Sequence, residues 1–132
     1  MNELCGGKRS CNINKTEMTD ILCRWLNTEV RFDTNVTRDN MGQLFWNGLR
    51  FGQIMDYYQL QPDIQLFSPI KSREAAMRNF SMLRESLEGI NIELSSWTMN
   101  ELRSANVTSI RQLLYQMYIG LKKHEQQREV TG

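Results

Sequence analysis

One histidine and three cysteines are the residues of this 132-residue chain best suited to nucleophilic or metal chemistry. A catalytic serine or cysteine needs a base beside it, but His124 lies far from the body of the sequence. A zinc site needs four clustered ligands, and no two of Cys5, Cys11 and Cys23 are spaced Cys-x-x-Cys. Cys5 and Cys11 could pair outside a cell, but we expect reduced thiols. We therefore expect no enzyme, no metal site and no cofactor.

Basic side chains are the remaining candidates for a binding site. The formal net charge is only +1, which argues against strong nonspecific attraction to nucleic acid or to anionic membranes. The charges are nevertheless grouped, because residues 85–101 contain four acids and no base, whereas residues 103–123 contain four bases and no acid. Two interpretations stay open: solvated helix faces, or a basic patch that meets an acidic filament. The candidate filament-binding residues are Lys71, Arg73, Arg78, Arg111, Lys122 and Lys123.

The first predicted helix carries the heptapeptide Ile-Leu-Cys-Arg-Trp-Leu-Asn at residues 21–27. Its isoleucine, both leucines and Trp25 share one helix face. Thr19 is the predicted N-cap, and the helix is expected to run to about Val30. A large aromatic residue on such a stripe is typical of a protein core. We therefore assign Trp25 to the core rather than to a binding surface.

Helical spacing and capping signals continue along the chain, and no segment shows the alternation of a strand. The further predicted elements are a short helix capped by Thr37, a helix over Leu49–Tyr58, a longest and central helix from Ser72 to Glu88, a short helix capped by Thr98 and a long last helix capped by Ser109. Gly89 is the predicted left-handed stop of the central helix. Gly120, inside the last helix, hints at close approach of another backbone. The sequence therefore predicts an all-α fold of four longer and two short helices.

The apolar stripes of these helices predict one compact domain. We expect a flexible leader over residues 1–17, a folded domain over 18–123 and a charged tail over 124–132. The predicted core residues are Leu22, Trp25, Leu26, Ile54, Phe80, Leu83, Leu87, Leu113, Leu114 and Met117. Of the other tryptophans, Trp97 is expected to pack onto the helix that follows it, and Trp46 is either at the edge of the core or in a contact site.

The order and spacing of these stretches resemble a calponin-homology domain. The matching stretches are Leu22, Trp25, Leu26 and Asn27 in the first helix, Asn47 to Ile54 at the entry to the third, Asn79-Phe80 with Leu83 and Leu87, and Ser109 to Tyr118 at the close. The resemblance covers about Met18 to Lys123 and is strongest to the divergent domains of ciliary proteins, which have similar Ile-Leu-x-x-Trp-Leu-Asn and Leu-Leu-Tyr-Gln-x-Tyr stretches. One departure is residues 103–107, Arg-Ser-Ala-Asn-Val, which replace the family's usual Asp-Ile-x-x-Gly.

The resemblance implies a non-enzymatic cytoskeletal binding module. Family members that bind F-actin commonly use two such domains in tandem, whereas the divergent single domains look like microtubule or axoneme binders. We therefore expect a protein partner, either microtubules (tubulin) or other axonemal proteins, and residence in the cytoplasm, the cytoskeleton or a ciliary or flagellar axoneme. An adaptor within a ciliary complex is the alternative, and F-actin is a third candidate. Neither nucleic acid nor membrane insertion is expected, since no apolar run approaches 18 residues.

Overall fold

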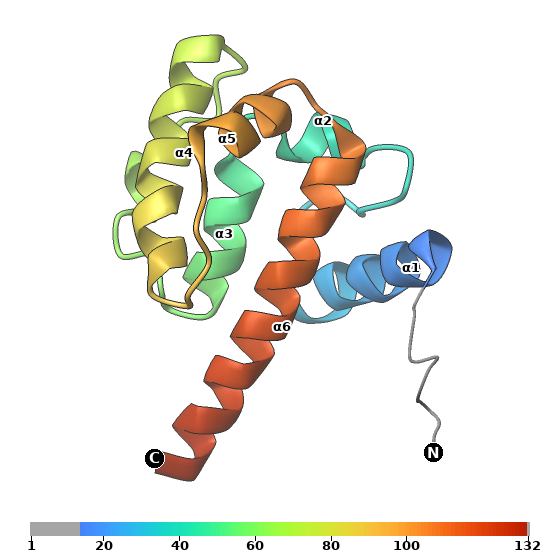
Figure 1. Cartoon of the computed structure of the whole chain (residues 1–132), viewed down its shortest axis with the longest axis vertical. Helices are drawn as coiled ribbons and strands as arrows, with labels where there is room; N and C mark the ends of the chain where they lie inside the picture. The colour runs from blue at the N-terminus through green and yellow to red at the C-terminus, as the bar shows by residue number, and fades with distance from the viewer. Residues whose placement is uncertain (1–13, 132) are drawn as a thin grey trace.

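The computed structural model describes residues 14–131, and this part of the chain is a bundle of α-helices (Figure 1). The helices are α1 (Lys15–Trp25), α2 (Met41–Phe45), α3 (Leu49–Tyr57), α4 (Arg73–Glu88), α5 (Ser96–Arg103) and α6 (Val107–Thr131). A π-helical turn, η1 (Leu26–Val30), extends α1, and a 3₁₀ turn, η2 (Ile64–Leu66), lies between α3 and α4. No strand occurs among residues 14–131, so the predicted all-α fold is confirmed.

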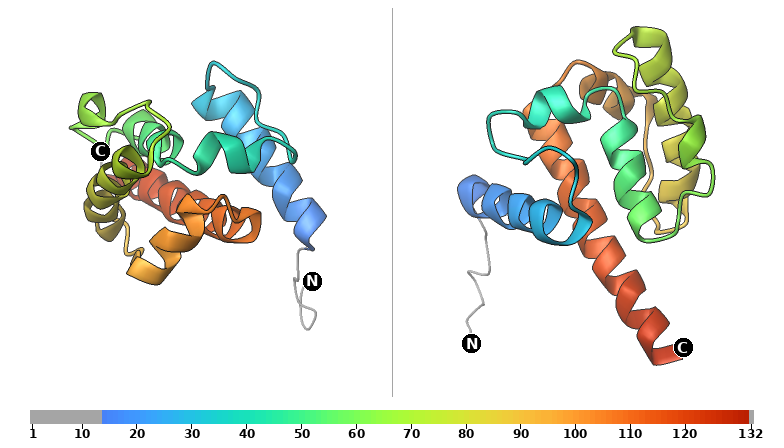
Figure 2. Two further views of the ribbon diagram at one scale, coloured as in Figure 1. Left: turned by 90° about the horizontal axis from the view of Figure 1, so that it is seen from above. Right: turned by 180° about the vertical axis from the view of Figure 1, so that it is seen from behind.

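The longest helix is α6, which occupies the centre of the fold. Its 25 residues span roughly 37 Å at the usual helical rise. It contacts α1, α2 and α5, with α1 on one side of it and α3 and α4 on the other (Figure 2). The prediction of α4 as the longest and central helix was wrong. The predicted tail also continues as helix to Thr131, and this end of α6 projects past the other helices (Figure 1).

A single core lies between these helices, and all ten residues predicted for it are buried. Three phenylalanine rings meet in its middle. The Phe51 ring contacts the Phe45 and Phe80 rings in tilted arrangements, with centroids 4.8 Å and 5.9 Å apart. Trp25 is 3% exposed, and its indole Nε1 donates a hydrogen bond to the Tyr58 hydroxyl. None of the described helices is long and apolar enough to cross a membrane.

The first helix begins earlier than its predicted cap. Asn14 is the N-cap of α1, where its side chain accepts a hydrogen bond from the Glu17 amide at 2.8 Å. The predicted cap, Thr19, is instead buried inside the helix, and its hydroxyl donates to the Lys15 carbonyl at 2.8 Å. The last three residues of the predicted leader therefore belong to α1. Residues 1–13 of the predicted leader, including both leader cysteines, lie outside the described residues.

The N-caps predicted for the last two helices, α5 and α6, also differ from those in the structure. Ser95 caps α5 by accepting from the Thr98 amide at 3.1 Å, so Thr98 is inside that helix. Asn106 accepts from the Ser109 amide at 3.1 Å. The cap of α6 is therefore Asn106, three residues before the predicted one. In both cases the structure uses a polar residue just upstream of an equally plausible one.

The predicted boundaries of α2 and α4 are partly right. Ser72 caps α4 as predicted, accepting from the Ala75 amide. Gly89 has a right-handed φ of −65°, so it is not the left-handed stop, and Asn91 takes the left-handed conformation with φ 63°. Thr37 lies one turn before α2, where its hydroxyl accepts from the amide of Asn40, the N-cap residue.

Glycine is required by close packing in α3 rather than in α6. A Cβ on Gly52 would lie 2.5 Å from the Phe67 ring, whereas a Cβ on Gly120 would meet only Ile90, at 3.5 Å. The nearest backbone atom to that second Cβ is the Ile90 carbonyl oxygen, at 3.7 Å, which is ordinary contact. The backbone predicted near Gly120 is therefore present, as that of Ile90, but its distance does not require a glycine. The tight position is Gly52, beneath an aromatic ring that is itself buried.

Alanine should therefore have opposite effects at these two glycines. Gly52→Ala should lower the free energy of unfolding by about 1–3 kcal/mol, because the Phe67 ring has to move. Gly120→Ala is the matched control and should raise it by about 0.5–1 kcal/mol, through helix propensity alone. Urea unfolding of both variants measures the difference. Equal effects at the two positions would contradict the packing observed at Gly52.

Candidate functional site

A buried asparagine holds the loop that leads into α4. The Asn79 side chain accepts a hydrogen bond from the Ser68 amide at 2.9 Å and donates to the Ser68 and Asn47 carbonyls, each at 2.9 Å. Asn47 in turn donates to the Ile70 carbonyl at 3.3 Å. The side-chain amides of Asn79 and Asn47 thus form hydrogen bonds with backbone N–H and C=O groups that have no partner within a helix. They thereby fix the chain immediately before Lys71 and immediately after Trp46.

Two arginines and a tryptophan border one hollow at the end of the bundle where α2, α4 and α5 meet. Its volume is about 360 Å³, and we call it the basic hollow. It is lined by Trp46, Arg73, Asn100, Arg103 and Ser104. Trp46 is the C-terminal cap of α2, Arg73 is the first residue of α4, and the other three come from α5 and its C-terminal cap. Three helices distant in sequence therefore build this site together.

The charges of the basic hollow are available for a partner. Neither Arg73 nor Arg103 forms an ion pair within residues 14–131, although Arg103 donates a hydrogen bond to Asn100 Oδ1 at 3.0 Å. Lys71 is exposed beside the hollow and reaches α2, where its Nζ donates to the Gln43 carbonyl at 3.4 Å. No carboxylate lines the hollow. An anionic group is therefore the ligand that this arrangement favours.

Lys122, one of the six candidate bases, is already paired. Its Nζ lies 2.7 Å from Glu29 Oε1 in η1 and 3.8 Å from Glu125 Oε1, with 30% of its side chain exposed. Burial lowers the pKa of this ammonium, but the hydrogen bond that it donates to Glu29, together with the nearby Tyr58 and carboxylates, raises the pKa more, so the net pKa is raised. Lys122 therefore ties α6 to the end of α1. Its charge is therefore already satisfied within the domain.

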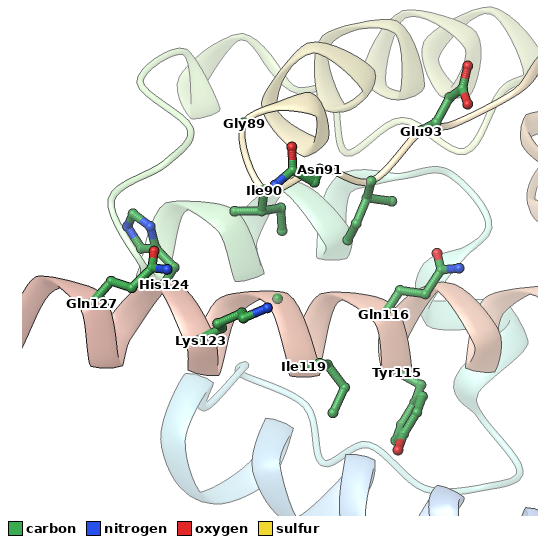
Figure 3. Close-up of a pocket in the computed structure, with 12 residues that line it drawn as sticks. Gly89, Ile90, Asn91, Glu93, Tyr115, Gln116, Ile119, Lys123, His124 and Gln127 are labelled. Atoms are coloured by element: carbon green, nitrogen blue, oxygen red, sulfur yellow. The ribbon is translucent and has the colours of Figure 1, made fainter.

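Lys123 borders a different hollow, of about 660 Å³, between α6 and the segment after α4. Figure 3 shows Lys123 and His124 on α6, with Ile90 and Asn91 across from them. Glu93 also lines this hollow, so its charge is mixed rather than basic. Lys123 is thus separated from the basic hollow.

The remaining two candidates are also placed elsewhere. Arg78 lines an apolar hollow on the outer side of α4. Arg111 lies in α6, half-buried and outside the basic hollow. The six candidate bases therefore do not converge on one surface, and the structure groups Arg73 and Lys71 with two residues that the candidate set lacked, Trp46 and Arg103.

Sequence signals for these two missed residues did exist. Trp46 follows a short helix and is partly buried, which fits both of its open interpretations, the edge of the core and a contact site. Arg103 begins the acid-free stretch of residues 103–123. The sequence does not show that Trp46 and Arg103 lie close together, because only the packing of α2 and α5 against α6 brings them together.

Other residues with possible chemistry are poorly placed for it. Trp97 is 71% exposed, so the prediction that it packs onto α5 was wrong. Burial, assisted by the nearby Asp20 carboxylate, raises the pKa of the Cys23 thiol, which keeps it protonated and weakly nucleophilic. Within residues 14–131, no three histidine, cysteine or carboxylate side chains are grouped closely enough to hold a metal ion.

Comparisons with known proteins agree with this architecture. The model of a family described as "CH-like domain in sperm protein" matches residues 22–119. The chain is 31% identical over 106 residues to sperm flagellar protein 2 of Mus musculus, 30% to that of Rattus norvegicus and 28% to that of Homo sapiens. Each match covers 80% of this chain but only 6% of the relative's length. No solved structure matches the chain significantly.

Proposed function

Because the chain belongs to the family of CH-like domains in sperm protein, we propose that it is a non-enzymatic attachment module that binds microtubules, alone or within an axoneme, through the basic hollow. The observation that carries this proposal is the pair of arginines, without ion-pair partners among the described residues, beside a partly buried tryptophan. The printed name of the mammalian relatives, sperm flagellar protein 2, supports a flagellar setting.

The basic hollow suits the acidic surface of a microtubule. Two guanidinium groups can each form paired hydrogen bonds with a carboxylate, and Lys71 adds a third positive charge at the rim. Trp46 supplies apolar area of the kind that carries binding energy at interfaces. Exposed ion pairs contribute only about 0–1 kcal/mol each, so binding has to use several bases together and to weaken as salt rises.

Charge reversal in the basic hollow should therefore abolish most filament binding. The double variant Arg73→Glu with Arg103→Glu should lower microtubule affinity roughly 5- to 30-fold, the factor that a loss of about 1–2 kcal/mol produces. Pelleting with purified microtubules at low and moderate salt measures the affinity. F-actin, pelleted in parallel, should be bound more weakly than microtubules.

A matched control separates the site from net charge. Arg24→Glu with Lys123→Glu makes the same change in total charge at two exposed positions outside the hollow. It should leave affinity within about twofold, since isolated exposed charges contribute little, and neither double variant should lower the melting temperature appreciably. Equal weakening by both pairs would contradict a specific site. If neither filament pellets the wild-type domain at low salt, direct filament binding is wrong and the adaptor function is favoured.

A further inference from the structure

A second surface lies on the outer side of α4, away from the basic hollow. It is a hollow of about 550 Å³ lined by Leu66, Met77, Arg78, Ser81 and Met82, and we call it the Met-lined hollow. Leu66 is 67% exposed and Met77 is 47% exposed. Exposed apolar side chains that lie together, rather than scattered singly, are a feature of interaction sites.

The spacing along α4 explains the shape of this hollow. Met77 and Ser81 are four residues apart, as are Arg78 and Met82, so each pair stands in line along the helix. Ser81 is the shortest of these side chains and leaves a gap among longer ones. Its hydroxyl donates to the Met77 carbonyl at 3.0 Å, which satisfies it within its own helix. The gap therefore accepts an apolar group without leaving the serine unpaired.

One charge borders this apolar gap. Arg78 is the sole charged residue of the lining, is exposed, and has no ion-pair partner within the described residues. The complementary ligand is therefore an apolar side chain with a carboxylate close to it. Methionines at the rim adapt their shape to such a side chain at little cost.

We propose that the Met-lined hollow binds an acidic amphipathic helix of a partner protein, which inserts an apolar side chain over Ser81 and pairs a glutamate or aspartate with Arg78. An added β-strand needs an exposed sheet edge, and residues 14–131 contain no strand. A proline-rich segment prefers aromatic-lined grooves, and no aromatic residue lines this hollow. Recognition of a phosphorylated or acidic motif uses a cluster of arginines, whereas Arg78 is the one arginine of this lining. A helix laid along α4 is the mode that fits an apolar hollow with one charge at its border.

Selection from a display library of helical peptides tests the proposal. Four positions of one peptide face, spaced i, i+3, i+4 and i+7, vary among Leu, Met, Phe, Glu, Lys and Ser. The wild-type domain should enrich peptides with an acidic residue next to an apolar one. Arg78→Glu should switch the preference to lysine, with about a tenfold loss for the acidic peptides, as expected when a charge-assisted contact becomes repulsive.

Two further variants complete the design. Met77→Asp should abolish binding of the selected peptides, whereas Ile119→Asp, which makes the same change at a residue that is 49% exposed on α6, should not. Failure to enrich acidic peptides, or retained binding by Met77→Asp, would overturn the proposal. So would a wild-type dimer that Met77→Asp dissociates in analytical ultracentrifugation, because the occupant would then be a second copy. Microtubule pelleting of Arg78→Glu should be unaffected, which keeps this test independent of the basic hollow.

Discussion

Replacing Trp25 with alanine should lower the free energy of unfolding by roughly 3–5 kcal/mol, as expected for a fully buried large aromatic residue. The indole is wedged between three helices: its Nε1 donates to the Tyr58 hydroxyl at 2.9 Å, and its ring meets the Tyr118 ring edge-on at 5.2 Å. Tyr58 ends α3 and Tyr118 lies on α6. Alanine would leave a cavity where α1 joins the bundle, and would remove the donor to the Tyr58 hydroxyl. Urea denaturation of the purified domain measures the loss.

The exposed Trp97 provides the control for this prediction. Trp97→Ala removes an equally large side chain from a 71% exposed position, and the free energy of unfolding should change by no more than about 0.5 kcal/mol. Trp25→Phe keeps a ring but loses the hydrogen bond to Tyr58, so its effect should fall between the two. A loss below about 1 kcal/mol for Trp25→Ala would mean that the indole is not a core residue.

The core could be predicted because the buried positions of a helix recur every three or four residues in the sequence. Trp25 follows Leu22 by three residues, and Phe80, Leu83 and Leu87 repeat at spacings of three and four, so each set shares one face. No tertiary knowledge is needed to see such a stripe. Which helix is central was harder to predict, since α6 owes its central position to contacts with α1, α2 and α5.

Helix caps could not be predicted to the residue, because several candidates compete within three to five residues of one another. Asn14 and Thr19 are both suitable caps by residue type, as are Ser95 and Thr98. The choice depends on which residue adopts the extended backbone of a cap, as Asn14 does with ψ 169°. Residue type alone does not encode this choice.

The candidate site was the least predictable part of the molecule. Arg73 and Arg103 are thirty residues apart by their numbering and share a hollow only because α4 and α5 pack together. Lys122 has the same residue type as a binding lysine, but it pairs with Glu29, 93 positions away. Charge runs along the sequence therefore identified basic residues, while the fold decided which of them remain available.

Asn79 shows the same limit for a buried polar residue. Its sequence context identified it only as part of a resemblance, at Asn79-Phe80, although it is completely buried and makes three hydrogen bonds. An asparagine that interrupts an apolar stripe is the signal that could have found it. Buried amides are almost always hydrogen-bonded, so its position predicts that nearby backbone groups depend on it.

Removing this amide should destabilise the domain nearly as much as removing Trp25. Asn79→Ala leaves the Ser68 amide and the Ser68 and Asn47 carbonyls without this partner, and the free energy of unfolding should fall by about 2–4 kcal/mol. Asn47 also donates weakly to the Ser68 carbonyl, at 3.4 Å, and does not replace the lost bonds. The exposed Asn100→Ala is the control and should change stability by less than about 0.5 kcal/mol.

A nearly isosteric substitution tells hydrogen bonding apart from packing at this position. Asn79→Asp keeps an acceptor for the Ser68 amide but, when ionised, directs a negative oxygen at two carbonyls that the native amide donates to. Burial should raise the pKa of the introduced carboxyl, so the variant should be least stable at neutral pH and should recover as acid protonates the group. A loss for Asn79→Asp that does not depend on pH would contradict this. If Asn79→Ala costs less than about 1 kcal/mol, water replaces the amide, and the loop before Lys71 is held by its apolar contacts instead.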